Sequence, residues 1–104
     1  MKDKGPLEKA IEGAFLRYMW KAYPKIRTPK LAMISQRSWP DRIVFLPNGH
    51  VLLIEFKRKG EKPTPLQAEC HDYLRSLGHD IKVFDDAREA VDYVSARLRE
   101  YGHD

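Results

Sequence analysis

Two apolar runs separated by a short turn segment constrain the fold of this chain more than any other feature of its sequence. Residues 42–46 (RIVFL) and 51–54 (VLLI) flank residues 47–50 (PNGH). Asn-Gly between two β-forming runs is the strongest short signal for a β-hairpin. Because both runs are apolar almost throughout, we expect a hairpin that other elements cover on both faces.

Three amphipathic segments surround this hairpin and are expected to form helices. They cover about residues 6–23, 64–78 and 86–102. Pro6 suits the first helical position, Thr64 and Gln67 form a capping box for the second helix, and Asp86 caps the third. A short strand is expected at residues 81–84, and a weaker one at residues 31–34.

The expected order of elements, α-β-β-β-α-β-α, predicts an α/β domain in which helices flank a mixed β-sheet with a central hairpin. A chain of 104 residues with 42% apolar residues fits one domain over residues 1–104. No apolar run is long enough to cross a membrane, and the charged N-terminus does not resemble a secretory signal. The single cysteine, Cys70, is typical of a reducing compartment, so we expect a cytoplasmic protein.

Positive charge is concentrated in the middle of the chain. Residues 17–62 contain eleven basic and three acidic side chains, whereas the last twenty residues contain six acidic and three basic ones. This distribution favours a polyanion partner bound through phosphate contacts. A solvated, positively charged face is the alternative.

Three charged residues lie where the hairpin strands begin and end. Asp41 precedes the first strand, and Glu55 and Lys57 share one face at the end of the second. A two-residue turn would pair Arg42 with Glu55 and direct Asp41 to the other face, whereas a three-residue turn would pair Asp41 with Lys57. We adopt the three-residue turn, or a bulge of the same effect, which places Asp41, Glu55 and Lys57 on one face.

An Asp and a Glu at one end of the hairpin make an oxygen-rich site of the kind that binds Mg²⁺ or Mn²⁺. The ammonium group of Lys57 would add a positive charge that stabilises developing negative charge. An ordinary surface salt bridge is the alternative. On the first helix, Glu8 and Glu12 are four residues apart and share a face, so each is either a third carboxylate of the site or a solvated glutamate.

The spacing of these residues resembles that of a known family. Pro40-Asp41 followed by Glu55-Phe56-Lys57 resembles the PD-(D/E)xK nuclease signature. The run PDRIVFLPNGHVLLIEFKRKGEKPTPLQAECHDYLRSLGHDIKVFD is similar to the VRR-NUC (virus-type replication-repair nuclease) domain, and EKAIEGAF is similar to its first helix. The resemblance covers the chain from about residue 8 to residue 86. It departs from the family's common pattern at Arg37-Ser38-Trp39, where a glycine is often found, and Trp39 would pack under the site or stack on a base.

The resemblance implies a restriction-endonuclease-like core and metal-dependent hydrolysis of DNA phosphodiester bonds. Asp41, Glu55 and the backbone carbonyl of Phe56 would bind Mg²⁺, with Mn²⁺ as a substitute and no small-molecule cofactor. A glutamate of the first helix would complete the set, with Glu12 preferred and Glu8 held in reserve.

The resemblance also implies roles for two further side chains and for the partners. Lys57 would orient the attacking water, and Gln67 would order a water or a phosphate at the rim of the site. Similar small phage and bacterial proteins act on branched DNA as dimers that resemble Holliday-junction resolvases. The basic side chains that would contact DNA are Arg27, Lys30, Arg37, Arg42, Arg58, Lys59 and Lys62.

Several points stay open at this stage. The candidate dimer surface is the aromatic end of the first helix, Tyr18, Trp20 and Tyr23, although these rings also suit a core. A non-catalytic nucleic-acid-binding module with the same fold is the alternative function. A zinc site is disfavoured, because one cysteine and four scattered histidines show no ligand spacing.

Overall fold

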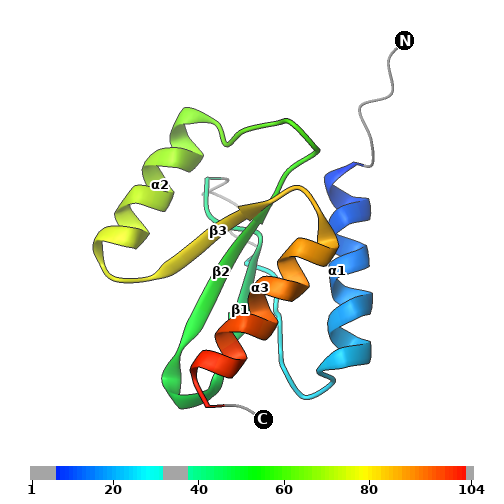
Figure 1. Cartoon of the computed structure of the whole chain (residues 1–104). Coiled ribbons are helices and arrows are strands. Elements are labelled where there is room, and N and C mark those ends of the chain that lie inside the picture. The colour runs from blue at the N-terminus through cyan, green and yellow to red at the C-terminus, as the bar shows by residue number, and fades with distance from the viewer. Residues whose placement is uncertain (1–6, 32–37, 103–104) are drawn as a thin grey trace.

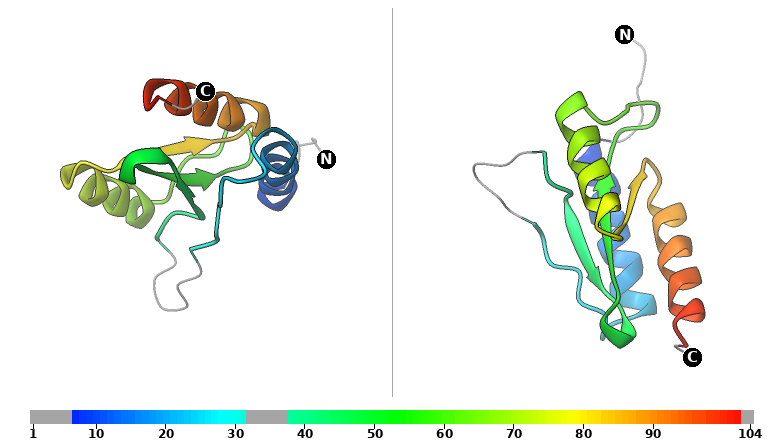
Figure 2. Two further views of the ribbon diagram at one scale, coloured as in Figure 1. Left: turned by 90° about the horizontal axis from the view of Figure 1, so that it is seen from below. Right: turned by 90° about the vertical axis from the view of Figure 1, so that its left-hand side faces the viewer.

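The computed structural model describes residues 7–31 and 38–102 as a mixed β-sheet with helices on both faces (Figures 1 and 2). The predicted α/β fold class is confirmed. In chain order the elements are α1 (Glu8–Ala22), β1 (Arg42–Phe45), β2 (Val51–Phe56), α2 (Pro65–Ser76), β3 (Asp80–Phe84) and α3 (Ala87–Glu100), with a single 3-10 turn at Pro47–Gly49 between β1 and β2. None of the helices in the described ranges is long and apolar enough to span a membrane.

The sheet has the order β1-β2-β3, so β2 is the central strand. β1 pairs antiparallel with β2 as the predicted hairpin, and β3 pairs parallel with β2. A parallel neighbour requires a crossover connection, and α2 supplies it. The end of β2 therefore lies between the end of β3 and the start of β1, with α2 close by.

The hairpin register differs from both registers considered from the sequence. Arg42 lies opposite Ile54, and the N–H of Leu46 donates to the carbonyl of His50 at 2.9 Å, so the turn consists of residues 47–49. Asn48 and Gly49 both take positive φ, of 62° and 77°. Those are the two turn residues best suited to the left-handed region.

The shifted register still brings the expected carboxylates together. The regular pairing ends at Arg42 and Ile54, because the N–H of Asp41 also lies against Ile54 and donates to its carbonyl at 2.9 Å. Ile43, expected opposite Glu55, lies opposite Leu53, a shift of two residues that keeps the paired side chains on their faces. The predicted register is wrong, whereas the expected proximity of the Asp41 and Glu55 carboxylates is observed.

The predicted weak strand at residues 31–34 falls mostly outside the described residues. The chain just before it runs along the free edge of β1 instead: the N–H groups of Ile43 and Phe45 donate to the carbonyls of Pro29 and Arg27, both at 3.1 Å. The N–H of Leu31 donates to the carbonyl of Asp41 at 2.9 Å. These bonds fix the backbone of Asp41 from the side opposite β2.

Side chains of β2 alternate between two hydrophobic clusters. Leu52, Ile54 and Phe56 are fully buried against α1 and α3, whereas Leu53 packs with Leu74 of α2 on the other face. Glu55 lies on this second face by the period of the strand. The central strand therefore carries a charged residue into the layer between the sheet and α2.

Helix boundaries agree closely with the sequence pattern. Thr64 and Gln67 form the predicted capping box of α2, and the Asp86 side chain accepts from the N–H of Glu89 at the start of α3. α1 begins at Glu8, with Leu7 as a cap that makes no side-chain hydrogen bond. Pro6, expected at the first helical position, lies outside the described residues.

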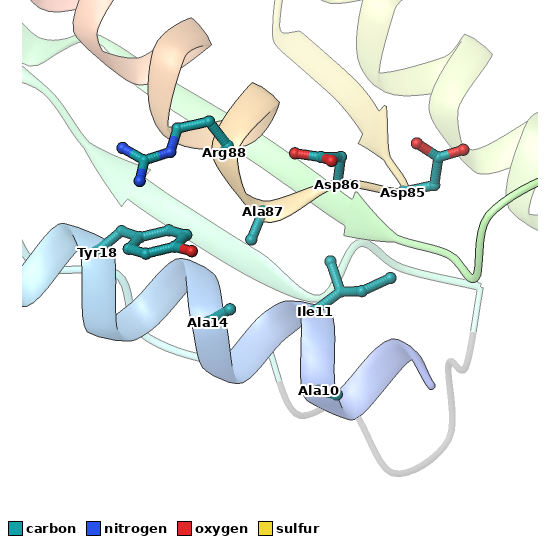
Figure 3. Close-up of a pocket in the computed structure, with 8 residues that line it drawn as sticks. All are labelled: Ala10, Ile11, Ala14, Tyr18, Asp85, Asp86, Ala87 and Arg88. Carbon is teal, nitrogen blue, oxygen red and sulfur yellow. The ribbon is translucent and has the colours of Figure 1, made fainter. Parts of the chain in front are cut away.

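α1 and α3 pack side by side on the first face, and a small pocket separates the start of α3 from α1 (Figure 3). The Arg88 guanidinium lies 4.4 Å from the centre of the Tyr18 ring, and the Tyr23 hydroxyl lies 2.6 Å from the hydroxyl of Ser95. Two of the three rings assigned to a dimer surface thus make contacts within the chain. Trp20, 70% exposed, remains open.

We expect Leu52→Ala to lower the free energy of unfolding by about 2–5 kcal/mol, because it leaves a cavity in a fully buried part of the core. Leu66→Ala is the matched control: Leu66 is 69% exposed, so the change should stay within about 0.5 kcal/mol. Urea unfolding followed by circular dichroism measures both. Equal losses in the two variants would contradict this assignment of the core.

Candidate metal centre

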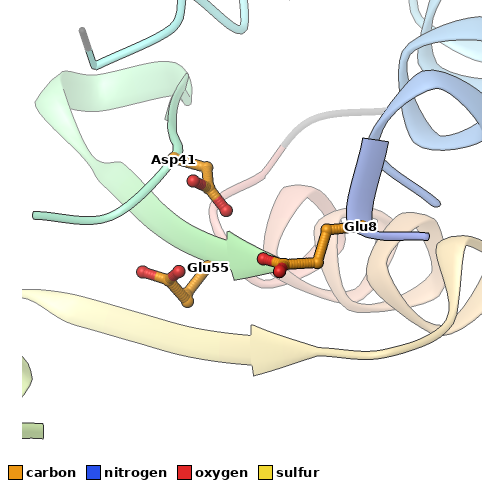
Figure 4. Close-up of side chains that lie close together, drawn as sticks. All are labelled: Glu8, Asp41 and Glu55. Atoms are coloured by element: carbon orange, nitrogen blue, oxygen red, sulfur yellow. The ribbon is translucent and has the colours of Figure 1, made fainter. Parts of the chain in front are cut away.

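Three carboxylates converge at one end of the sheet. One oxygen from each of Glu8, Asp41 and Glu55 lies within 4.8 Å of the other two (Figure 4). They come from three elements: the first turn of α1, the residue before β1, and the end of β2. Glu8 is exposed, Asp41 is half-buried and Glu55 is 2% exposed, so the cluster opens to solvent on the side of Glu8.

The side chain of Asp41 is held by the backbone of the neighbouring strand. Its Oδ2 accepts a hydrogen bond of 2.7 Å from the N–H of Phe56, and its own N–H donates to the carbonyl of Ile54 at 2.9 Å. Burial raises the pKa of this carboxyl, and the Phe56 N–H opposes that rise. The Asp41 carboxylate is thus fixed on the sheet beside Glu55.

Glu55 is the buried member of the cluster, and two polar groups contact it. Its Oε2 accepts a hydrogen bond of 3.2 Å from Nε2 of Gln67 and lies 3.9 Å from Nζ of Lys57. Burial, and next the negative charge of Asp41, raises the pKa of Glu55 to about 8 from its ordinary value of 4.5, although Lys57 opposes this. Repulsion among carboxylates is therefore built into the site.

These residues fit a hard divalent cation. Mg²⁺ and Mn²⁺ prefer carboxylate and carbonyl oxygens, and a cation between the three carboxylates would remove their mutual repulsion. Within the described residues, Oε1 of Glu55 is buried without a hydrogen-bond partner, which leaves one buried oxygen of the set unsatisfied. A buried oxygen of this kind needs an explanation, and a cation ligand provides one.

Lys57 lies directly beyond the end of β2. Its N–H donates to the carbonyl of Phe84 at 2.9 Å, which continues the pairing with β3, and its side chain is only 11% exposed. A lysine with so little exposure is held beside its carboxylate partner rather than free in solvent. The strand alternation predicted this proximity to Glu55 correctly.

Gln67 has two roles at once. Its Oε1 accepts from the N–H of Thr64 at 2.9 Å and completes the capping box, while its Nε2 donates to Glu55. A side-chain amide has a separate donor and acceptor, so the cap of α2 and the orientation of Glu55 share one residue.

His71 was not assigned to the site from the sequence. It is 2% exposed, and its Nε2 lies 3.6 Å from Oε1 of Glu55. Burial lowers its pKa. The available signal was spacing: His71 follows Gln67 by four residues, so both lie on the face of α2 that packs on the sheet.

Glu12 and Arg42 have a different partner from the one expected. Nε of Arg42 donates to Oε2 of Glu12 at 2.6 Å, and its NH1 donates to the carbonyl of Thr28 at 3.0 Å. Glu12 lies one helical turn beyond Glu8, beside Arg42 rather than within the carboxylate cluster. In the metal-free structure Glu8 is therefore the glutamate of α1 that lies in the carboxylate cluster, whereas Glu12 forms an ion pair with Arg42. The assignment of Arg42 to DNA stays a prediction.

The remaining basic side chains assigned to DNA are mostly exposed. Arg27, Lys30, Lys59 and Lys62 are exposed, and Arg58 is half-buried near Glu61. The positive charge of Lys30 is close enough to Asp41 to oppose the rise in the pKa of its carboxyl. Arg37 lies outside the described residues. In the sequence, exposed basic residues thus lie both before Asp41 and after Glu55.

We expect Glu55→Gln to stabilise the metal-free protein at alkaline pH. Because the folded-state pKa of about 8 exceeds the unfolded value of 4.5, the folded protein binds the extra proton, and stability falls as pH rises through this window. The variant should match the wild type near pH 4.5 and exceed it above pH 8 by roughly 2–4 kcal/mol.

Chemical denaturation in EDTA across this pH range measures the difference. Glu61→Gln, at a 53% exposed glutamate, is the control and should show no such divergence. A parallel pair of stability curves for Glu55→Gln and wild type would mean that Glu55 is ionised at no cost in the folded protein.

Comparisons with known proteins bear on the fold. No family model matches the chain. Two solved structures, named "VRR_NUC domain" and "VRR_NUC domain protein", have TM-scores of 0.71 and 0.75 at 22% and 18% identity. They cover 85% and 95% of this chain and 94% and 93% of their own chains.

A phage protein provides a closer sequence match over a shorter region. "Putative nuclease p44" of Acyrthosiphon pisum secondary endosymbiont phage 1 is 46% identical over 56 residues. The match spans 54% of this chain and 60% of the phage protein.

Together, the order of elements and the sheet topology define a small mixed α/β domain. More particularly, the fold is that of a VRR-NUC domain, at nearly full coverage of two structures of that name. The resemblance stated from the sequence is confirmed.

Proposed function

We propose that this chain is a metal-dependent nuclease that hydrolyses phosphodiester bonds of DNA. The observation that carries the proposal is the convergence of Glu8, Asp41 and Glu55 with the Lys57 ammonium 3.9 Å from Glu55. The phage relative's name, a nuclease, supports it. Mg²⁺ is the metal we assign, with Mn²⁺ as a substitute, because every side-chain donor of the cluster is a carboxylate oxygen.

Each residue of the site has a role in this proposal. Glu8, Asp41, Glu55 and the Phe56 carbonyl would hold the cation, which when bound would lower the pKa of a water and neutralise phosphate charge. Lys57 orients the attacking water and stabilises the negative charge that develops on the phosphate. Gln67 fixes the Glu55 carboxylate through its amide N–H. Water oxygen forms the new bond to phosphorus as the bond to the leaving sugar oxygen breaks.

The exposed cations would bind the phosphate backbone on either side of the scissile bond. We assign this role to the exposed Arg27, Lys30, Lys59 and Lys62, and also to the half-buried Arg58. Branched DNA is the proposed substrate, and a homodimer, with one site for each of two strands, is the proposed assembly. Trp20, 70% exposed, is the most exposed member of the aromatic surface on α1 and the one we assign to such a contact, beside Tyr18 at 37%.

We expect Glu8→Gln to affect mainly the cleavage rate and Glu12→Gln to affect mainly the free energy of unfolding. Removing Glu8 should lower the cleavage rate at least about 10-fold, because a ligand oxygen is lost. Removing the Glu12 charge should preserve most of the rate but lower the free energy of unfolding by about 1–3 kcal/mol, because Arg42 is only 16% exposed and loses its partner.

Single-turnover cleavage and urea unfolding of both variants provide the comparison. If Glu12→Gln removed cleavage while Glu8→Gln left it intact, the roles of the two glutamates in this proposal would be reversed.

Cleavage of labelled DNA tests the proposal as a whole. Linear duplex, flap and four-way-junction substrates are incubated with Mg²⁺, Mn²⁺ or EDTA, with Glu55→Ala as the matched variant and Glu61→Ala as the control. We expect metal-dependent cutting, fastest on a branched substrate, that Glu55→Ala abolishes and Glu61→Ala retains. DNA binding without cutting under every metal would instead assign the fold to a non-catalytic binding module.

A further inference from the structure

A groove runs along the outer side of α2, next to the carboxylate site. Among the described residues, a hollow of about 300 Å³ is lined by Ser38, Trp39, Leu66, Glu69, Cys70 and Tyr73. Leu66 is 69% exposed and Tyr73 is 55% exposed. Large apolar side chains that remain exposed together around a hollow are typical of a binding surface.

Gln67 connects this groove to the site. A second hollow is lined by Ser38, Thr64, Leu66 and Gln67, so it shares Ser38 and Leu66 with the first. Gln67 also donates to Glu55. A chain of contacts thus leads from the buried carboxylate, through Gln67, to the aromatic groove on the adjacent side of α2.

The composition of the groove favours a nucleobase over a phosphate. Trp39 and Tyr73 offer aromatic rings, on which bases stack irrespective of sequence. Glu69 lines the same hollow, and its carboxylate repels phosphate while accepting hydrogen bonds from the amino group of cytosine. Phosphates have a separate place nearby, because Lys59 and Lys62 are exposed just before Thr64, which caps α2.

We propose that this groove binds an unpaired base of the DNA substrate, next to the phosphate held at the carboxylate site. The inference rests on the proposed nuclease function and specifies its substrate: DNA with at least one base out of the stack near the cleavage point. A base inside an intact duplex is stacked and paired, so it must leave the helix before an aromatic side chain can contact its face. An unpaired base at a junction or flap enters at a lower cost.

Binding in EDTA tests the groove without cleavage. The probes are a short fluorescein-labelled duplex with a deoxycytidine overhang, and the same duplex with an overhang of abasic spacers that keeps every phosphate. We expect the base-bearing probe to bind at least about 5-fold more tightly, the lower end of what one stacked base contributes. Equal affinities for the two probes would overturn the inference.

Variants at Tyr73 assign the effect to the groove. Tyr73→Ala should remove most of the difference between the two probes, whereas Tyr73→Phe, which keeps the ring, should retain it. Because Tyr73 is 55% exposed, neither change should prevent folding. A difference between probes that persists in Tyr73→Ala would assign base binding to another part of the surface.

Trp39 provides an independent signal. The chain has two tryptophans, so Trp20→Phe leaves Trp39 as the single reporter. The base-bearing overhang should quench its fluorescence, and the abasic overhang should not. Absence of any difference in quenching would exclude Trp39 from the contact and overturn the groove as described.

Measuring the oligomeric state by light scattering shows whether the groove binds a second copy of this chain rather than a DNA base. The oligomeric state should be the same for wild type and Tyr73→Ala, and a change would assign the groove to a protein interface and overturn the inference. Failure here is distinct from failure of the nuclease proposal: metal-dependent cleavage with equal binding of both probes would remove the base site alone. Absence of DNA binding and cleavage would remove both.

Discussion

The burial of one carboxylate, Glu55, determines the arrangement of everything else in the site. The strand that carries it is central in the sheet and alternates strictly between two packed layers, so its fifth residue must point into the layer beneath α2. A charge there needs partners. Gln67 and Lys57 provide them, and His71 lies on the other oxygen. Residues from the cap of α2, from the end of β2 and from the inner face of α2 thus all contact the Glu55 side chain.

This arrangement stores unfavourable electrostatic energy in the metal-free protein. Asp41 and Glu8 approach Glu55 although each carboxylate raises the pKa of Glu55, and desolvation acts in the same direction. A fold optimised for stability alone would replace at least one of them. Unfavourable electrostatics of this kind are typical of sites where a bound ligand relieves them. The same three carboxylates that repel one another are therefore the part of the molecule best prepared to bind a divalent cation.

The positions of the helices and of the hairpin could be predicted from the sequence, because local patterns determine them. The hairpin register could not, because it depends on how the two strands pack. Asn48-Gly49 located the hairpin, and Thr64 with Gln67 located the start of α2, since turn and cap chemistry are local. The register was wrong because Pro47, rather than His50, enters the turn. A shift of two residues keeps the paired side chains on their faces. Asp41 lies beyond the last pair, where its hydrogen bonds to the backbone of Ile54 and Phe56 place its carboxylate beside Glu55.

Choosing between Glu8 and Glu12 required a different kind of information. Both lie on one face of α1, so the periodicity of the helix cannot distinguish them. The distinction comes from where α1 lies along the sheet and from Arg42, whose guanidinium takes Glu12 as its partner. That ion pair leaves Glu8, one turn nearer the end of β2, as the open member of the cluster. Because Glu8 is exposed and Glu55 is buried, the substrate of the proposed nuclease would approach the cluster from the side of Glu8. On the other side of Glu55, Gln67 donates to this carboxylate and also lines the hollow next to the groove along α2.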